Sequence, residues 1–561
     1  MPNKVPIIKA GSPSRVRNAF DLSQRHLFTA KAGQLLPLCP IELMPHDHVE
    51  INASDFMRLM ETKNAPFLTM RSVYEFFAVP IHQLWSPFDQ FITGMSDYHS
   101  DFYTEKGTPR SIPAIDFSTL KSKLVGNNDA LSDILGFSKT EGAKKILDLL
   151  GYFGGSLNAM PTDTLLVNPF RILAYNKIYQ DWYRNTNYES YDASTFNIDS
   201  LTDLTVIPDD KVFSTTMSSY GWLQMHYRNW ALDLMTNIRP SLLFKPDVIP
   251  SQFFVGNSPL MVRTSIPLNA PDYKNDVGVA PYSNNAPVSA VNQASVPTTA
   301  SIRNAFAVDK LCQLMMRAGK TYQDQMKAVF GVEVPVGRDH RCNYLGGFTS
   351  DMQISDVTQT SGNTGGHDTS YLGKIGGKGT SSGSGKIVFD AKEHCILMCI
   401  YSLVPIASYD SYRLDPFNRK LSRGDYFLPE FEDLGMQPLF QSDLNSLPTR
   451  FGGDLSHNLT FTSVCGWQPR YSEYKTAIDQ CHGTFRDSLS AWCCTRFHNE
   501  FVSVTPTGIS DGYFKINPRV LDQCLSVNAN NYEETDQVFG GAYFNIIRVS
   551  DMSEQGLPSL K

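Results

Sequence analysis

Gly466-Trp-Gln-Pro-Arg-Tyr-Ser-Glu-Tyr-Lys-Thr-Ala-Ile-Asp-Gln-Cys-His-Gly-Thr-Phe485 is the most distinctive stretch of this sequence. The run before it, Leu459 to Cys465, alternates apolar and polar side chains, which predicts a β-strand with one buried face. Gly466 and Pro469 are expected to end that strand.

Aromatic and charged side chains alternate after this break. Rings beside a few fixed charges are typical of permanent protein–protein contacts. We therefore expect a subunit interface here, with an ordinary surface loop after a core strand as the alternative. The candidate interface residues are Trp467, Arg470, Tyr471, Tyr474 and Lys475.

Length and composition favour a β-rich fold. A chain of 561 residues that is 42% hydrophobic can bury a large core. Its 33 prolines and 38 glycines imply many turns, which favours numerous strands joined by long loops over a bundle of helices. The net charge of −7 excludes a uniformly basic nucleic-acid-binding protein, so any basic surface must be local.

The ten cysteines show no spacing typical of a disulfide framework, and Cys493 and Cys494 are adjacent. The first residues lack the apolar segment of a signal peptide, so we expect free thiols in a reducing cytosol. The longest apolar run, Cys395 to Ala407, contains Pro405 and is too short to cross a bilayer. It predicts a buried strand.

Residues 1–31 form a basic arm at the start of an acidic chain, with Asp21 as their one acid. We expect this arm to lie along a phosphate backbone, where each cation displaces counterions. A solvated, poorly ordered terminus is the alternative. The candidate nucleic-acid-binding residues are Lys4, Lys9, Arg15, Arg17, Arg25 and Lys31.

Residues 81–190 are predicted to be mainly helical. The clearest helix begins at Asn168-Pro169, a cap followed by a first-turn proline. A stripe at helical spacing follows, which predicts a core contact rather than a ligand site. The stripe consists of Ile172, Tyr175, Tyr179 and Trp182.

Two segments differ in composition from the rest of the chain. Residues 241–300 hold eight prolines and only six charged side chains, which predicts a linker or a long excursion of irregular loops and short strands. Residues 362–386 are predicted to be a Gly-rich flexible loop or hairpin tip, because positions 362–385 contain nine glycines.

No pattern in the sequence predicts an active site, a metal site or a cofactor. The glycines around Lys378 and Lys386 lack the Lys-Ser/Thr ending of a phosphate-binding loop. His46 and His48 flank Asp47 in a proline-led turn, where the two rings are not expected to share a metal. We therefore expect a protein that is not an enzyme and carries no cofactor.

Further motifs are spread along most of the chain. They are Asn18-Ala-Phe-Asp-Leu-Ser23, Ala32-Gly-Gln-Leu-Leu-Pro37, Asn168-Pro-Phe-Arg-Ile-Leu-Ala-Tyr-Asn-Lys-Ile-Tyr-Gln-Asp-Trp-Tyr-Arg184, Tyr344-Leu-Gly-Gly347, Gln359-Thr-Ser361 and Arg423-Gly-Asp-Tyr-Phe-Leu-Pro429. Together with the 466–485 stretch they resemble the major capsid protein of the Microviridae, small single-stranded DNA phages, and are closest to its gokushovirus branch.

The resemblance implies a mainly β fold, an eight-stranded viral jelly roll with long inserted loops and several helices, which spans residues 20–561 as one capsid domain. It also implies a T=1 icosahedral shell that encloses circular single-stranded DNA. In the gokushovirus branch a large insertion forms a spike, and residues 241–300 are the candidate for such a surface protrusion.

The partners that the resemblance implies are further copies of the chain, the packaged DNA, small DNA-binding, scaffolding or pilot proteins of the phage, and a host surface receptor. The implied location is the virion, assembled in the host cytoplasm. Two other classes stay open. A replication-associated DNA-binding protein or nickase would need a histidine pair that holds a metal, and a tyrosine nucleophile. A jelly-roll protein that binds or hydrolyses carbohydrate would need paired carboxylates on facing strands.

Overall fold

The computed structural model describes most of the chain outside its longest loops. The described residues are 17–93, 111–126, 132–155, 163–201, 206–214, 221–240, 322–334, 340–358, 375–410, 415–432, 435–440, 464–486, 488–496, 504–505, 508–509, 511–525 and 536–554, with isolated positions between 303 and 314 and at 443.

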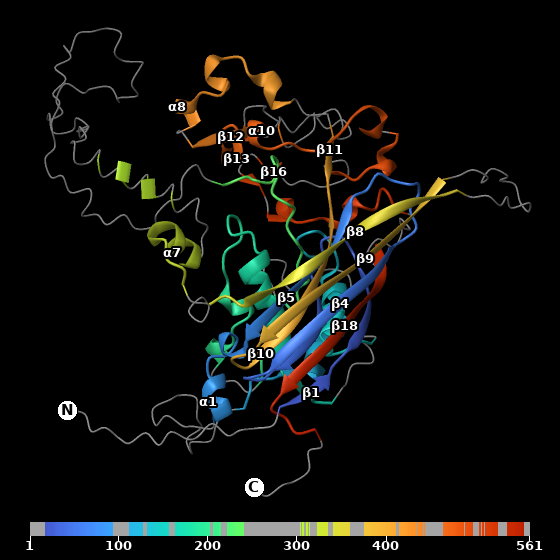
Figure 1. The fold of residues 1–561 in the computed structure, drawn as a ribbon, viewed down its shortest axis with the longest axis vertical. Helices are drawn as coiled ribbons and strands as arrows, with labels where there is room; N and C mark the ends of the chain where they lie inside the picture. Colours follow the sequence, from blue (N-terminus) through green and yellow to red (C-terminus); the bar gives the residue numbers. More distant parts are fainter. Residues whose placement is uncertain are drawn as a thin grey trace, which may run out of the picture. The chain divides into compact units, whose positions relative to one another are not determined.

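Nine described strands form one curled antiparallel sheet in the order β1-β18-β4-β9-β8-β5-β10-β3, with β2 also paired to β18 (Figure 1). They are β1 (Asn18–Asp21), β2 (Gln24–Ala30), β3 (Leu36–Leu43), β4 (His48–Leu59), β5 (Met70–Pro80), β8 (Asn343–Thr358), β9 (Ile375–Asp390), β10 (Cys395–Pro405) and β18 (Val538–Ser550). The mainly β prediction is confirmed, and the curled sheet is consistent with a jelly roll that carries insertions.

The long strand β18 explains how nine strands make a sheet that is eight strands wide. One edge of β18 pairs with β4 along nearly its whole length. On the other edge, β1 pairs with the end of β18 near Ile547 and β2 pairs with the part between Val538 and Phe544. β1 and β2 therefore share one place in the sheet, as two parts of an interrupted strand.

Helices cover one half of this sheet, which we call the covered half. α4 (Phe170–Ile178) contacts β5 and β10, and α3 (Lys139–Leu149) contacts β3. Strands packed on both faces lose the alternation of polar and apolar residues. Accordingly, β10 is buried along nearly its whole length, and the prediction of a buried strand in Cys395–Ala407 is confirmed.

The predicted helix at Asn168-Pro169 is present. It begins one residue later than predicted, at Phe170 with Pro169 in the cap position, and the Asn168 side-chain oxygen accepts a hydrogen bond of 2.8 Å from the backbone N–H of Phe170. The predicted stripe is buried up to Tyr179, whereas Trp182 is 40% exposed. The reason is a π-helical turn at Tyr179–Tyr183, which holds an extra residue and rotates Trp182 away from the stripe.

The strands β2, β18 and β4 form the open half of the sheet, because their outward side chains Leu27, Phe56 and Tyr543 are exposed. Burial alternates residue by residue along β4, as expected for a strand with one buried face. Its inward side chains, such as Val49, Ile51 and Met57, belong to the main core. Its outward side chains Phe56 and Arg58 are exposed.

Smaller elements surround the sheet. The short strands are β6 (Ile115–Asp116) paired with β7 (Leu166–Val167), β11 (Ser408–Asp410) between β14 (Gln480–Cys481) and β15 (Thr495–Arg496), β12 (Met436–Phe440) paired with β13 (Val464–Pro469), and β16 (Val504–Thr505) paired with β17 (Gly508–Ile509). The other helices are α1 (Phe88–Thr93), α2 (Phe117–Gly126), α5 (Asp209–Val212), α7 (Tyr322–Phe330), α8 (Pro429–Glu432) and α10 (Ser472–Lys475). None of the described helices is long and apolar enough to cross a membrane.

Gly466 does not end its strand, contrary to the prediction. β13 runs from Val464 through Gly466 to Pro469, and residues 459–463 lie outside the described part of the chain. A Cβ atom on Gly466 would lie 2.9 Å from the carbonyl oxygen of Arg239, so glycine is needed for close approach of two backbones and not for a turn.

The Gly-rich loop predicted at 362–386 is wrong for residues 375–386, which belong to β9. Here, too, glycine permits close packing. A Cβ atom on Gly383 would lie 2.7 Å from the Cβ of Ser350, and one on Gly385 would lie 2.7 Å from the ring of Phe348. The remaining part of the prediction, 362–374, lies outside the described residues.

The chain divides into two compact units, residues 1–240 with 340–561, and residues 241–339. The candidate protrusion at 241–300 falls in the second unit and outside the described residues, so it stays a prediction. Within that unit, α7 ends at Phe330 and is followed by Gly331, whose φ of +69° is typical of a glycine that ends a helix.

Candidate assembly and nucleic-acid surfaces

The predicted interface stretch folds onto a segment about 40 residues earlier in the sequence. We call residues 415–432, 435–440 and 464–475 the signature lobe. In it, β12 pairs with β13, and α8 and α10 lie beside this hairpin (Figure 1).

Tyr471 is the centre of the lobe. Its side chain is only 2% exposed, and its hydroxyl donates a hydrogen bond of 3.0 Å to the carbonyl oxygen of Tyr426. Its backbone adopts a left-handed conformation with a φ of +62°, which costs a non-glycine residue roughly 1–2 kcal/mol. The Gln437 side chain holds it there by accepting a 2.8 Å hydrogen bond from the Tyr471 N–H. Tyr471 therefore fixes the lobe from inside and does not offer its ring to a partner.

A buried ion pair lies next to Tyr471. The Lys420 ammonium is 2.7 Å from a carboxylate oxygen of Glu473, and both side chains are less than a tenth exposed. The ammonium also lies 3.9 Å from the centre of the Tyr474 ring. Burial opposes ionisation of Glu473, but hydrogen bonds from Lys420 and Gln437 outweigh it, so the pKa of Glu473 is lowered.

Five aromatic side chains form an exposed rim around Tyr471, which we call the aromatic rim. They are Phe417, Tyr426, Phe427, Phe431 and Tyr474, each between 38% and 55% exposed. The rings of Phe417 and Tyr474 meet edge to face with centres 5.0 Å apart, and the ring of Phe427 meets that of Tyr471 at 5.2 Å. Exposed apolar side chains that gather in one place mark interaction surfaces more often than scattered ones do.

The other predicted interface residues have different places. Arg470 is internal: its guanidinium donates to the carbonyl of Gly424 at 3.2 Å and lies over the rings of Phe431 and Tyr471. Trp467 is half-buried, and its backbone exchanges two hydrogen bonds with Arg239.

Lys475 is about half exposed and pairs with Glu432 at 2.7 Å. Of the five predicted interface residues, Tyr474 and Lys475 therefore stand on the surface, Arg470 and Tyr471 support the rim, and Trp467 is bound through its backbone to Arg239.

The sequence reading missed four of the five rim residues. Phe417, Tyr426, Phe427 and Phe431 lie in or near the Arg423–Pro429 motif, which contributes to the family resemblance but does not predict an interface. Pairing of β12 with β13 brings that motif to the 466–485 stretch, and no local pattern reveals such a long-range pairing.

The predicted basic arm is described only in part. Lys4, Lys9 and Arg15 lie outside the described residues. The Arg17 side chain donates to the carbonyl of His46 at 2.5 Å and lies 3.6 Å from a carboxylate oxygen of Asp551. Arg17 therefore already has partners within the subunit.

The other two predicted residues belong to the sheet. Lys31 is only 6% exposed, with its ammonium 5.0 Å from the centre of the Phe137 ring, so we drop it from the nucleic-acid candidates. Arg25 is exposed on the outer face of β2, where a phosphate could reach it.

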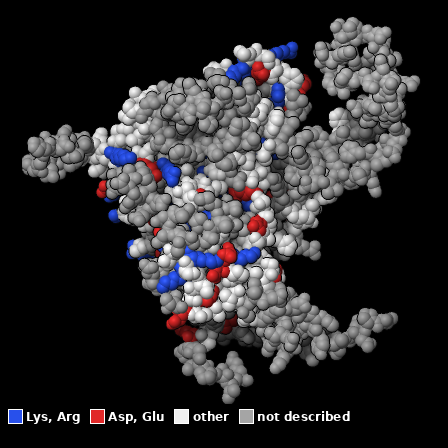
Figure 2. All heavy atoms as spheres, turned by 180° about the vertical axis from the view of Figure 1, so that it is seen from behind, with Lys and Arg blue, Asp and Glu red and all other residues white. Residues whose placement is uncertain are grey.

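Charges of both signs are mixed over the molecule. In the part of the face drawn in colour in Figure 2, Lys and Arg stand next to Asp and Glu rather than forming a continuous basic field. Among the described residues several exposed cations form ion pairs, such as Arg71 with Asp351 at 3.1 Å and Lys386 with Glu50 at 2.5 Å. A basic residue without such a partner is therefore the informative exception.

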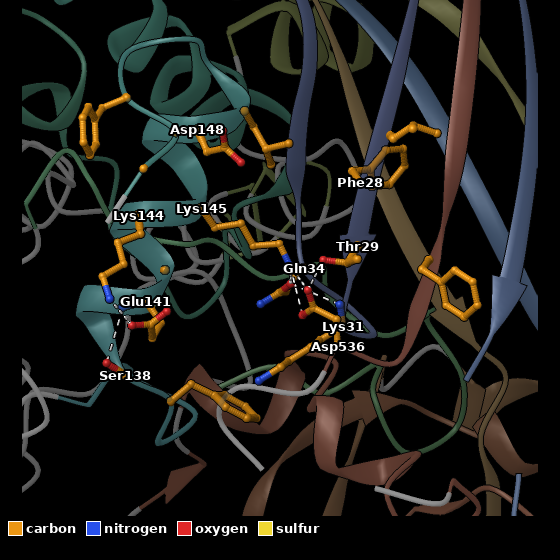
Figure 3. Close-up of a pocket in the computed structure, with 18 of the residues that line it drawn as sticks. Phe28, Thr29, Lys31, Gln34, Ser138, Glu141, Lys144, Lys145, Asp148 and Asp536 are labelled. Carbon is orange, nitrogen blue, oxygen red and sulfur yellow. Dashed lines mark hydrogen bonds and ion pairs between the residues drawn. The ribbon is translucent and has the colours of Figure 1, made fainter. Parts of the chain in front are cut away.

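A groove of about 910 Å³ lies between α3 and the strands β2 and β18. Figure 3 shows Lys145 reaching from α3 toward Gln34 and Asp536, and the Lys145 ammonium is 3.0 Å from Asp536. Burial lowers the pKa of Lys145, although Asp536 opposes this. On the same helix, Glu141 pairs with Lys144.

The acids that line this groove bear on the alternative that the protein hydrolyses carbohydrate. A glycosidase needs two carboxyl groups that face a shared substrate. Of the three acids that line the groove, Asp536 and Glu141 are each bound to a lysine, which leaves Asp148 without an acidic counterpart to work with. The geometry does not favour glycan hydrolysis.

His46 and His48 do not point to a common metal position. His46 lies 3.1 Å from Asp551, whereas His48 lies 2.6 Å from Asp390 on a different strand. Each ring is thus bound to its own carboxylate. Within the described residues no group of three metal-binding side chains gathers.

Comparison with known proteins agrees with this reading. A family model described as "Capsid protein (F protein)" matches residues 10–122 and 138–560. The chain is 24% identical to Capsid protein VP1 of Bdellovibrio phage phiMH2K, over 97% of this chain and 95% of that protein. It is 22% identical to Capsid protein VP1 of Chlamydia phage 1, over 97% and 96% respectively. The resemblance to Microviridae capsid proteins is confirmed, and the chain belongs to the capsid protein (F protein) family.

Proposed function

We propose that this chain is the major capsid protein of a gokushovirus-like phage, and that it assembles with copies of itself into a T=1 icosahedral shell around circular single-stranded DNA. The observation that carries the proposal is the family match over nearly the whole chain, on a structure built around a curled antiparallel sheet. The role is structural, and we propose no catalytic activity.

The aromatic rim is our candidate for a contact between subunits. Its rings are exposed, yet Tyr471, Arg470 and the Lys420–Glu473 pair hold the lobe beneath them in one conformation. Interfaces in permanent assemblies are enriched in aromatic residues and arginine. A shell needs contacts in which one patch meets a different patch on the neighbour, since such contacts close into rings.

The shell places the chain in the virion, with assembly in the host cytoplasm. Its further partners would be the packaged DNA, small DNA-binding, scaffolding or pilot proteins of the phage, and a host surface receptor. Residues 241–300 would form a surface protrusion, and the basic arm at residues 1–31 would contact the genome.

The rim can be tested separately from the fold. Replacing Phe417 and Tyr474 together with serine should leave folded subunits that no longer close into particles, because both rings are exposed. Tyr191→Ser is a matched control, since Tyr191 is also about half exposed but lies outside the lobe. Sedimentation velocity and circular dichroism separate the two effects. Normal particles from the double variant would remove the rim from the interface.

A further inference from the structure

The outer face of the open half carries three rows of side chains that run across β2, β18 and β4. The strand registers place Arg25, Tyr543 and Ser54 in one row, Leu27, Gly541 and Phe56 in the next, and Thr29, Phe539 and Arg58 in the third. Successive outward residues on a strand are roughly 7 Å apart, so the two arginine rows lie roughly 13 Å from each other.

These rows enclose a groove of about 370 Å³. In the middle row of this groove, Gly541 contributes backbone and no side chain. A Cβ atom there would already lie 2.8 Å from Leu27. The walls are apolar and open to solvent: Leu27 is 69% exposed, and Phe56, Phe539 and Tyr543 are between 40% and 47% exposed.

The two arginines of the groove differ from most other basic residues of the sheet. Among the described residues, no carboxylate lies within ion-pair distance of Arg25 or Arg58, whereas Arg71, Lys386 and Arg548 each have one. The Arg58 guanidinium lies 5.2 Å from the centre of the Phe56 ring, a cation–π contact that keeps it beside the groove.

One acid, Asp55, also lines the groove, but it belongs to the inner face. It is 6% exposed and accepts a 3.0 Å hydrogen bond from the hydroxyl of Ser350 on β8. The outward charge of the groove is therefore positive, from Arg25 and Arg58.

We propose that this groove binds single-stranded nucleic acid, with phosphates on Arg25 and Arg58 and unpaired bases on Phe56, Phe539 and Tyr543. This inference rests on the proposed function, since it names the surface by which the subunit holds the enclosed DNA. Binding sites for single strands combine cationic groups that follow the backbone with rings on which bases stack.

The exposed rings decide in favour of a single strand over a duplex. A duplex buries the faces of its bases in its own stack, so it could use the two arginines but not the three aromatic rings. A protein segment is the competing occupant, and it would use the rings without the salt dependence that phosphate contacts produce.

The test uses the purified full-length chain and fluorescently labelled oligo-dT, with a duplex of equal length as the comparison. The parent should bind oligo-dT more tightly than the duplex at the same salt concentration. Arg25→Ala with Arg58→Ala should make the slope of log affinity against log salt less steep by about 1.4, since two phosphate contacts are lost.

Changes to the rings should act differently. Phe56→Ala with Tyr543→Ala should weaken oligo-dT binding about fivefold or more while leaving the salt slope unchanged. Arg71→Ala is the matched control, because Arg71 is an exposed sheet arginine that already has an acidic partner. Parental binding by both double variants would overturn the proposal, as would equal binding of duplex and single strand by the parent.

The outcomes separate this proposal from the proposed function. Closed particles that package DNA normally despite both double changes would remove the groove and leave the shell function intact. Variants that bind oligo-dT as the parent does but fail to assemble would assign the groove to a protein contact instead. Absence of particles from the parent itself would contradict the shell function.

A second measurement uses the parent chain alone, so its result does not depend on whether a variant folds. Photo-crosslinking of bromodeoxyuridine-substituted single strands to the parent chain, mapped by mass spectrometry, should label Phe56, Phe539 or Tyr543. Crosslinks confined to other parts of the chain would overturn the proposal.

Discussion

The covered half and the open half of the sheet differ in what their charged side chains contact. In the covered half, Lys177 of α4 and Asp181 of the following π-helical turn form a 3.1 Å ion pair in which both side chains are at most 3% exposed, and Arg228 lies 2.6 Å from Glu75. On the open half, Arg25 and Arg58 have no carboxylate partner among the described residues. The cations of these two covered-half pairs stabilise the fold, whereas Arg25 and Arg58 are available to a ligand.

The largest effect is expected where a buried ion pair is broken. Lys177→Met leaves the Asp181 carboxylate buried without its cation, which should lower the free energy of unfolding by about 3–5 kcal/mol. Lys144→Met is the control: it breaks a pair of similar spacing with Glu141 in α3, but a more exposed one, and should cost less than about 1 kcal/mol. Denaturant unfolding measures both. Equal losses would show that burial does not set the cost of losing an ion pair.

The signature lobe offers the same contrast between two neighbouring tyrosines. Tyr471→Ala removes a buried ring and two backbone hydrogen-bond contacts, and should lower the free energy of unfolding by about 3 kcal/mol. Tyr474→Ala removes a ring that is 47% exposed and should cost clearly less. Its main effect should be on particle formation. A reversed order in thermal unfolding would contradict the assignment of the two rings.

Acid should weaken the covered half through His226. This ring is buried against Tyr179, with centres 3.8 Å apart, and burial lowers its pKa to about 3. Below a pH of about 6.5 the unfolded chain binds a proton that the folded chain does not, so stability falls between about pH 6.5 and pH 3.

The contribution of His226 should approach about 1.4 kcal/mol for each pH unit in that window. His226→Gln keeps a polar group near Asn176, whose side-chain oxygen is 2.8 Å from the ring, but cannot titrate. Its stability should therefore depend less on pH than that of the parent. Identical pH dependence in both proteins would show that His226 does not cause the effect.

The smallest effect on stability is expected on the open half. Arg58→Ala should change the free energy of unfolding by less than about 0.5 kcal/mol, because the side chain is exposed and has no ion-pair partner among the described residues. Differential scanning calorimetry checks this. A loss comparable to that of Lys177→Met would mean that the open face serves the fold after all.

The sequence predicts the class of fold better than it predicts the sites. Alternation and apolar runs reveal strands such as β10 because burial acts on each residue locally. Gly466 and Gly383 were misread because glycine is used there for close approach to Arg239 and Ser350, which are distant in sequence. The roles of Tyr471 and Tyr474 could not be separated for the same reason: Tyr471 donates a hydrogen bond to the carbonyl oxygen of Tyr426, and a single sequence does not reveal that contact.

The basic residues teach a similar lesson. Arg17, Arg25 and Lys31 look alike in the sequence, but one is ion-paired, one is exposed and one is buried. The sequence does not indicate a binding role for Arg58, because Arg58 and Arg25 share a surface only when β18 pairs with both β2 and β4.

Electron microscopy of the purified full-length chain, combined with sedimentation velocity, tests the central claim most directly. The account predicts closed particles of a single size with T=1 icosahedral symmetry, in equilibrium with or assembled from folded subunits. A chain that stays monomeric at every concentration and ionic strength, while its fold is intact by circular dichroism, would contradict it.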